Sequence, residues 1–165
     1  MGATSANHAM WTLTRALLVA TAVASGASAL AREPLPLAGQ YRVERYEFAS
    51  TAAATEAQAK AVVGAIAVFG RKSARFNGQS CRLTSVEQRE VSTSDYLLEG
   101  HRTSPRQLGI MEKKVRVTTT NCEGALREII QLDPRNLVLE QDGVFYFLVK
   151  ESAPSSGPPR RVSGA

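Results

Sequence analysis

The sequence predicts a mainly β fold, an antiparallel sandwich or barrel of about seven to eight strands with one short α-helix. Segments in which apolar and polar residues alternate recur at a spacing of roughly 8–12 residues along most of the chain. Dipeptides that favour tight hairpin turns separate some of these segments, namely Asn77 with Gly78 and Asp142 with Gly143. Only residues 51–63 combine a helix-favouring composition with recognisable helix ends.

The amino-terminal residues 1–31 are typical of a secretory signal peptide. Arg15 supplies a positive charge, residues 16–30 carry no charge, and an Ala-x-Ala sequence closes the stretch. Met10 is an alternative start of translation. The apolar stretch is shorter than the roughly 20 residues that cross a bilayer, so we expect cleavage and no stable membrane anchor. We therefore expect a periplasmic or secreted protein.

The remaining chain divides into three parts by composition. Residues 32–38 contain Pro34 and Pro36 and are expected to form an extended lead-in. Residues 39–151 carry the alternating pattern and are expected to form the β-barrel domain. Residues 152–165 are rich in Ser, Pro and Gly and too poor in apolar residues to form a packed structure, so we expect a flexible tail.

The first predicted strand contains a change of phase. Tyr41 and Val43 alternate with polar residues, and Tyr46 and Phe48 continue the alternation one position out of step. A shift of this kind predicts a β-bulge or a bend near Arg45.

Residues 51–63 follow this strand and favour a helix, because they are rich in alanine and contain Glu, Gln and Lys. Thr55 and Gln58 have the spacing of a capping box, and Gly64 supplies a helix stop. We expect no other helix of comparable strength.

Strand and turn signals fill most of the chain after this helix. The expected strands are residues 65–69, 74–76, 79–91, 113–120, 126–132, 137–139 and 144–149. The expected turns are at Asn77 and Gly78, residues 121–124, residues 133–136, and Asp142 and Gly143.

Residues 92–109 interrupt the strands and lack a period-2 pattern. Within them we expect a helical turn at residues 95–99. A second turn is expected to begin at Ser104 and Pro105, because a cap residue there precedes a proline in the favoured first helical position.

Two cysteines, Cys81 and Cys122, are the only ones in the chain. An even number of cysteines in an exported chain predicts a disulfide, which would stabilise the fold by roughly 4 kcal/mol. The alternative is a reactive or metal-binding pair. The long spacing, the absence of a C-x-x-C motif and the single histidine outside the signal peptide, His101, weigh against that alternative. We assign no metal ligand and no catalytic residue.

The chain has a net charge of +5, which raises the question of whether it binds nucleic acid. The basic residues are scattered among acidic residues, without the clustering and interleaved aromatics that follow a phosphate backbone. Residues 64–73 resemble a phosphate-binding loop, but their glycines are one residue too far apart and no helix is expected after them. We expect no nucleic-acid partner and no cofactor.

Aromatic residues of the predicted strands are expected to fill the core, and some would line a pocket. Phe145 and Phe147 share one face of their strand, so Tyr146 is expected to point the other way. The candidate contact residues for a ligand or partner are Tyr41, Tyr96, His101, Arg102 and Tyr146.

Parts of the sequence resemble lipocalin-like proteins. Gly39, Gln40 and Tyr41 before a strand are similar to the Gly-x-Trp opening of that family, with Tyr in place of Trp. The second half resembles small exported bacterial proteins without an assigned activity, at Leu108, Gly109, Ile110, Val115, Val117, Asn121, Cys122, Leu132, Asp133 and residues 137–148. The resemblance covers about residues 39–150 and implies a small antiparallel, calycin-like β-barrel. It leaves the ligand open.

These observations lead us to expect an exported, non-enzymatic envelope protein that binds a small apolar ligand or a protein partner. A ligand carrier predicts an apolar cavity of about 300 Å³ or more, reached from one end of the barrel. An alternative is an inhibitor or immunity-type protein that blocks a lysozyme, a protease or a toxin, with residues 92–104 at the contact. A hydrolase that uses His101 is a further alternative, because Ser94, Asp95, Glu99 and Ser104 lie nearby in sequence.

Overall fold

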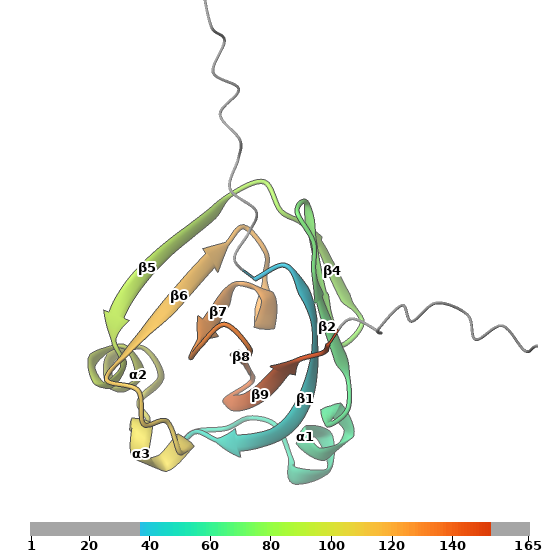
Figure 1. The fold of residues 1–165 in the computed structure, drawn as a ribbon. Coiled ribbons are helices and arrows are strands. Elements are labelled where there is room, and N and C mark those ends of the chain that lie inside the picture. Colours follow the sequence, from blue (N-terminus) through green and yellow to red (C-terminus); the bar gives the residue numbers. More distant parts are fainter. Residues whose placement is uncertain (1–36, 153–165) are drawn as a thin grey trace, which may run out of the picture. The chain divides into compact units, whose positions relative to one another are not determined.

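The computed structural model describes residues 37–152, which form nine strands, three α-helices and one 3₁₀ turn (Figure 1). The strands are β1 (Gly39–Phe48), β2 (Ile66–Phe69), β3 (Ser73–Phe76), β4 (Gln79–Arg82), β5 (Val86–Ser92), β6 (Lys114–Thr120), β7 (Glu128–Gln131), β8 (Asn136–Gln141) and β9 (Val144–Lys150). The helical segments are α1 (Glu56–Val62), α2 (Thr93–His101), α3 (Pro105–Leu108) and η1 (Gly124–Leu126). The signal peptide predicted at 1–31 lies outside the described residues, as do most of the lead-in and all but one residue of the tail.

All nine strands belong to one antiparallel sheet, in the order β4-β3-β2-β1-β9-β8-β7-β6-β5. The sheet curls into a half-barrel, as Figure 1 shows. The prediction of a mainly β, antiparallel fold is confirmed. The number of strands differs from the expected seven to eight, because the predicted strand at residues 79–91 is divided into β4 and β5 by residues 83–85.

The two edge strands of the sheet, β4 and β5, follow one another in the chain but do not pair with each other. We call β4, residues 83–85 and β5 the seam of the half-barrel. Cys81 of β4 forms a disulfide with Cys122, with Cα atoms 5.8 Å apart, as predicted. The Asn121 side chain accepts hydrogen bonds from the backbone N–H groups of Thr84 (2.8 Å) and Ser85 (3.3 Å). A covalent bond and one asparagine therefore hold the seam where strand pairing is absent.

The phase change in β1 produces the predicted bulge. The register between β1 and β9 shifts between Val43 and Arg45. Tyr41 and Val43 before the bulge are buried, and Tyr46 and Phe48 after it pack on the same core. The bulge therefore keeps all four apolar side chains on the inner face of the half-barrel.

Two hairpin turns form at the predicted dipeptides. Asn77 and Gly78 have φ angles of +45° and +79°, and Asp142 and Gly143 have φ angles of +54° and +79°. Positive φ at both central residues is the geometry that suits the twist of a two-residue hairpin. The turn at Gly143 is also enclosed, because residues 49–54 wrap around it: Ala53 N donates to Asp142 O at 2.9 Å, and Ala49 N donates to Gly143 O at 2.8 Å.

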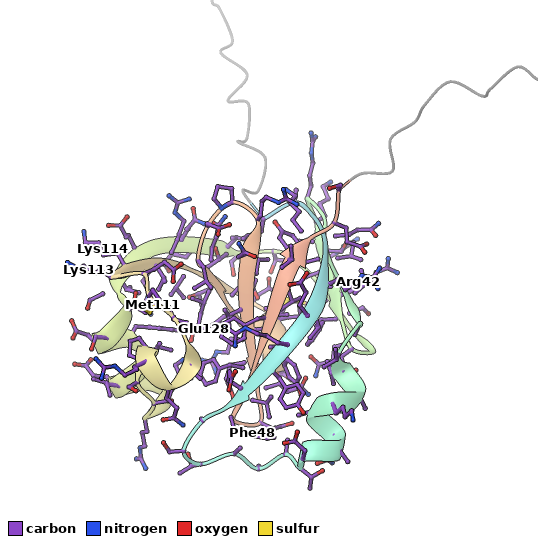
Figure 2. The ribbon with its side chains drawn as sticks, turned by 60° about the horizontal axis from the view of Figure 1, so that its bottom comes forward. Arg42, Phe48, Met111, Lys113, Lys114 and Glu128 are labelled. Carbon is purple, nitrogen blue, oxygen red and sulfur yellow. A yellow bond between two sulfur atoms is a disulfide. The ribbon has the colours of Figure 1, made fainter. Side chains whose placement is uncertain are left out.

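The first helix, α1, is shorter than the predicted 51–63 but has the predicted capping box. The Thr55 hydroxyl accepts from Gln58 N at 3.3 Å, and the Gln58 side chain accepts from Thr55 N at 2.8 Å. Ala59 and Val62 are buried against the inner face of the sheet. Figure 2 shows α1 at the end of the half-barrel where β1 finishes at Phe48.

The expectation of a single substantial helix is wrong, because residues 92–109 contain α2 and α3. We expected only a turn at residues 95–99, but α2 has nine residues. Its sequence is mostly polar, and only Thr93 and Leu97 are buried along it, so its own amphipathic pattern is weak. The turn predicted at Ser104 and Pro105 is α3, in which the Ser104 hydroxyl accepts from Gln107 N at 3.2 Å.

Two hydrophobic cores lie on opposite faces of the sheet. The inner core includes Tyr41, Phe69, Phe76, Leu137, Leu139, Tyr146 and Leu148. The outer core lies between the sheet and the helices α2 and α3 and includes Leu97, Leu108, Val117, Val138, Phe145 and Phe147. Tyr146 therefore points away from Phe145 and Phe147, as predicted. None of the helices within residues 37–152 is long and apolar enough to cross a bilayer.

Candidate functional site

The five predicted contact residues lie in two separate regions. Tyr41 and Tyr146 belong to the inner core of the half-barrel. Tyr96 and His101 lie on α2, on the outer face of the sheet, and Arg102 is the C-cap residue of the same helix. The structure therefore brings three of these residues together and leaves the two inner tyrosines apart from them.

Tyr41 lies in a filled part of the half-barrel. Its side chain has no exposed surface, its ring meets Phe69 edge to face at a centroid distance of 5.8 Å, and burial raises the pKa of its hydroxyl. Its hydroxyl has no hydrogen-bond partner among the described residues. A ligand could reach Tyr41 only after the inner core had repacked.

Tyr146 lies instead beside a hollow of about 560 Å³ at the end of the half-barrel that α1 covers. We call this the end hollow. Ala61 and Val62 of α1 line one side of it, the turn residues Asn77 and Asp142 line others, and Gln141 contributes to its wall. The hollow is thus reached from one end of the curled sheet.

Two polar groups of the end hollow have unusual surroundings. The Gln141 Oε1 atom is buried and has no hydrogen-bond donor among the described residues. The ring of Tyr146 meets Phe76 edge to face at 6.0 Å. Burial, followed by the nearby Asp142 carboxylate, raises the pKa of the Tyr146 hydroxyl. The hydroxyl therefore stays protonated and can both donate and accept a hydrogen bond.

The second region is a furrow on the outer face, which we call the His101 furrow and define by Tyr96, His101, Glu128, Glu140 and Phe145. Three adjoining hollows of about 260, 580 and 330 Å³ are each lined by His101. The His101 ring meets Tyr96 at 5.1 Å and Phe145 at 5.3 Å, both edge to face. Two aromatic rings therefore hold the imidazole in place.

A hydrogen bond between Tyr96 and Glu128 fixes the side of the furrow next to α2. The Tyr96 hydroxyl donates to Glu128 Oε2 at 2.8 Å. Burial, and then this hydrogen bond, raise the pKa of Tyr96 well above its usual value, so the phenol remains a donor. Glu128 is visible in Figure 2 on the part of the sheet that faces α2 and α3.

Two carboxylates share this furrow. Because Ile129 pairs with Leu139 in the register of β7 and β8, Glu128 and Glu140 lie opposite each other on neighbouring strands. Both line the 260 Å³ hollow together with Tyr96 and His101. Two exposed arginines lie near Glu128. The Arg89 Nη2 atom is 4.0 Å from Glu128 Oε1, and Arg127 lines the same 260 Å³ hollow.

The His101 furrow presents two carboxylates, a phenol and an imidazole. Among the described residues, no hydrogen bond joins His101 to Ser94, Asp95 or Ser104, which the hydrolase interpretation would require. The Ser104 hydroxyl instead accepts the capping hydrogen bond of α3. No group of three or more His, Cys, Asp and Glu residues within residues 37–152 is arranged to hold a metal ion.

Three residues of these sites were not identified from the sequence: Gln141, Glu128 and Glu140. Alternation along β7 and β8 places Glu128 and Glu140 on the same face as Ile130 and Val138, so that pattern could have marked them as outer-face residues. Their position opposite each other depends on the register between the strands. The sequence alone does not specify that register.

Comparisons of this chain with protein-family models, with curated proteins and with solved structures find no match.

Proposed function

We propose that this protein is an exported, non-enzymatic binding protein that holds a small molecule in the end hollow. The ligand has an apolar body and one hydrogen-bond donor. The observation that carries this proposal is the buried, unpartnered Oε1 atom of Gln141 beside a hollow of about 560 Å³.

The size and the position of the end hollow support a small ligand. A carrier needs a cavity of about 300 Å³ or more with an opening at one end of the sheet. The end hollow exceeds that volume and lies beneath α1, with Ala61 and Val62 providing apolar contact surface. The interior around Tyr41 is filled, so the ligand binds at the end of the half-barrel and does not occupy its centre.

The ligand needs a hydrogen-bond donor because the buried Gln141 Oε1 atom has no donor within residues 37–152. A buried carbonyl oxygen without a donor destabilises a protein by about 1–3 kcal/mol, so such groups are rare in native folds. A ligand hydroxyl or N–H group that reaches Gln141 Oε1 would supply the missing donor. The binding site therefore selects a donor-bearing molecule over a hydrocarbon of the same shape.

The proposal includes export from the cytoplasm and a calycin-like fold. The Cys81–Cys122 disulfide supports an oxidising compartment, in keeping with the predicted signal peptide. A ligand at the open end of a curled antiparallel sheet also fits the calycin-like interpretation.

A matched pair of probes tests this function. We expect 4-hexylphenol to bind the oxidised protein about tenfold more tightly than hexylbenzene, since one hydrogen bond to a buried acceptor contributes about 1 kcal/mol or more. Chemical-shift changes in NMR spectra should occur at Tyr146 and Val62. The variant Gln141→Leu should bind both probes equally.

Gln131→Leu is the matched control, because Gln131 also has a buried, unpartnered Oε1 but does not line the end hollow. That variant should keep the tenfold preference for the phenol. Equal binding of the two probes by the unmodified protein, or no binding of either, would rule out the proposed ligand class.

A further inference from the structure

We propose that the His101 furrow is a second binding site, which takes an organic cation, a guanidinium or ammonium group, between the carboxylates of Glu128 and Glu140. This site is separate from the end hollow, because it lies on the outer face of the sheet beside α2. The proposal does not depend on the ligand of the end hollow.

The first argument is the pairing of like charges. Glu128 and Glu140 face each other across β7 and β8, and carboxylates in directly opposite positions destabilise a sheet. Both side chains are partly buried, which reduces their screening by water. A cation between them would remove the repulsion.

The second argument is that the carboxylates keep free acceptor positions. Glu128 accepts from Tyr96 through Oε2, and Glu140 accepts from Gly143 N through Oε1 at 2.7 Å. Glu140 forms no ion pair with any lysine or arginine among residues 37–152. Glu140 Oε2 therefore remains available to a ligand on the side of the 260 Å³ hollow. Among the described residues, Glu128 Oε1 has only a long ion pair with exposed Arg89, at 4.0 Å, which a ligand cation would replace.

The third argument is the aromatic wall. The ring of His101 lies between the rings of Tyr96 and Phe145 along the furrow. Its centroid is 5.1 Å from that of Tyr96 and 5.3 Å from that of Phe145. Carboxylates next to aromatic rings are the combination that recognises a guanidinium or ammonium group, because ring faces and carboxylate oxygens both attract positive charge. The three hollows around His101 leave room for the chain that carries the cation.

The test uses probes that differ in charge but not in shape. Nα-acetyl-arginine amide carries a guanidinium group, and Nα-acetyl-citrulline amide replaces it with a neutral urea. We expect only the arginine probe to shift the NMR signals of Tyr96, His101 and Phe145 in the oxidised protein. Its affinity should fall as the salt concentration rises.

Two isosteric variants identify the carboxylates. Glu140→Gln and Glu128→Gln keep the acceptor oxygens for Gly143 N and Tyr96, so the local hydrogen bonds persist. Each variant should lower the affinity for the arginine probe about fivefold, as expected for the loss of one charge-assisted contact. Glu140→Gln should also raise the urea midpoint of the unliganded protein, because it removes the opposed charge. Glu44→Gln, an exposed carboxylate on β1, is the control and should change neither quantity.

A pentapeptide with a central arginine distinguishes the source of the cation. Tighter binding of the peptide than of the single residue would indicate an arginine side chain of a protein partner. Equal binding would indicate a small free amine or guanidine. Equal affinity for the arginine and citrulline probes, or unchanged affinity in both glutamine variants, would overturn the proposal.

Discussion

The substitution Gly143→Ala should destabilise the protein far more than the same substitution at Gly78. Both glycines occupy the second position of a hairpin turn with φ of +79°, so the backbone strain imposed by a side chain is the same at both. Their surroundings differ. A Cβ atom at Gly143 would lie 2.6 Å from Ala52 Cα and 2.8 Å from Thr51 O, whereas one at Gly78 would meet nothing within 4 Å.

The magnitudes follow from these distances. An alanine in the left-handed region costs about 1 kcal/mol, and the lower entropy of the unfolded chain offsets part of it, so Gly78→Ala should lower the free energy of unfolding by less than about 1 kcal/mol. Gly143→Ala adds a clash with backbone atoms, which cannot rotate away, and overpacking of this kind costs about 1–3 kcal/mol. We therefore expect a total of about 3 kcal/mol at Gly143 and a fall in Tm of roughly 10 °C.

Urea denaturation of the oxidised protein, followed by circular dichroism, measures both variants under the same conditions. The difference between them isolates the clash, because the contribution of φ cancels. If the two variants lose the same stability to within about 0.5 kcal/mol, residues 49–54 do not enclose the hairpin tip as described.

Three further predictions concern the disulfide and titratable groups. Replacing Cys81 and Cys122 with Ser should lower the free energy of unfolding by about 4 kcal/mol in urea denaturation and should make exchange of amide hydrogens faster at the seam, since the loop spans 41 residues. All four tyrosines have a pKa above the usual 10.0 in the folded protein, Tyr96 most of all, so tyrosinate absorbance should appear only at a higher pH than in the unfolded chain. The stability that these protonated tyrosines contribute is present below pH 10 and is lost as pH rises beyond it. A normal tyrosine titration in the native protein would contradict this. Burial opposes ionisation of Asp133, but hydrogen bonds from Asn136 and from backbone N–H groups outweigh this effect and lower its pKa. Its contribution to the free energy of unfolding is therefore present above pH 3.8 and is lost as pH falls. Asp133→Ala should destabilise the protein at pH 7 and weaken the dependence of stability on acid pH, and an unchanged dependence would count against this reasoning.

Features that depend on neighbouring residues were predictable from the sequence. The bulge near Arg45 follows from the phase of four apolar residues, and the capping box of α1 follows from Thr55 and Gln58. The hairpin turns follow from backbone angles that few residues other than Asn, Asp and Gly adopt easily. In each case, the physical cause lies within a few positions of the chain.

Features that depend on tertiary contacts were not predictable. The helix α2 is stabilised by packing of Leu97 against the outer face of the sheet, and its own polar sequence carries little helical signal. Glu128 and Glu140 become neighbours only through the register of β7 and β8. The end hollow depends on where α1 lies, and no local pattern specifies that position.

The pairing of β1 with β9 sets the order in which this chain can fold. Seven residue pairs join the first strand to the last, from Tyr41 with Lys150 to Phe48 with Val144. A chain that emerges in order from a ribosome or a membrane channel can pair β1 with β2 early, but the other edge of β1 stays unpaired until residue 150 has also emerged. Assembly of the complete sheet waits for the whole domain, and a chaperone that shields Gly39–Phe48 would be useful during that interval.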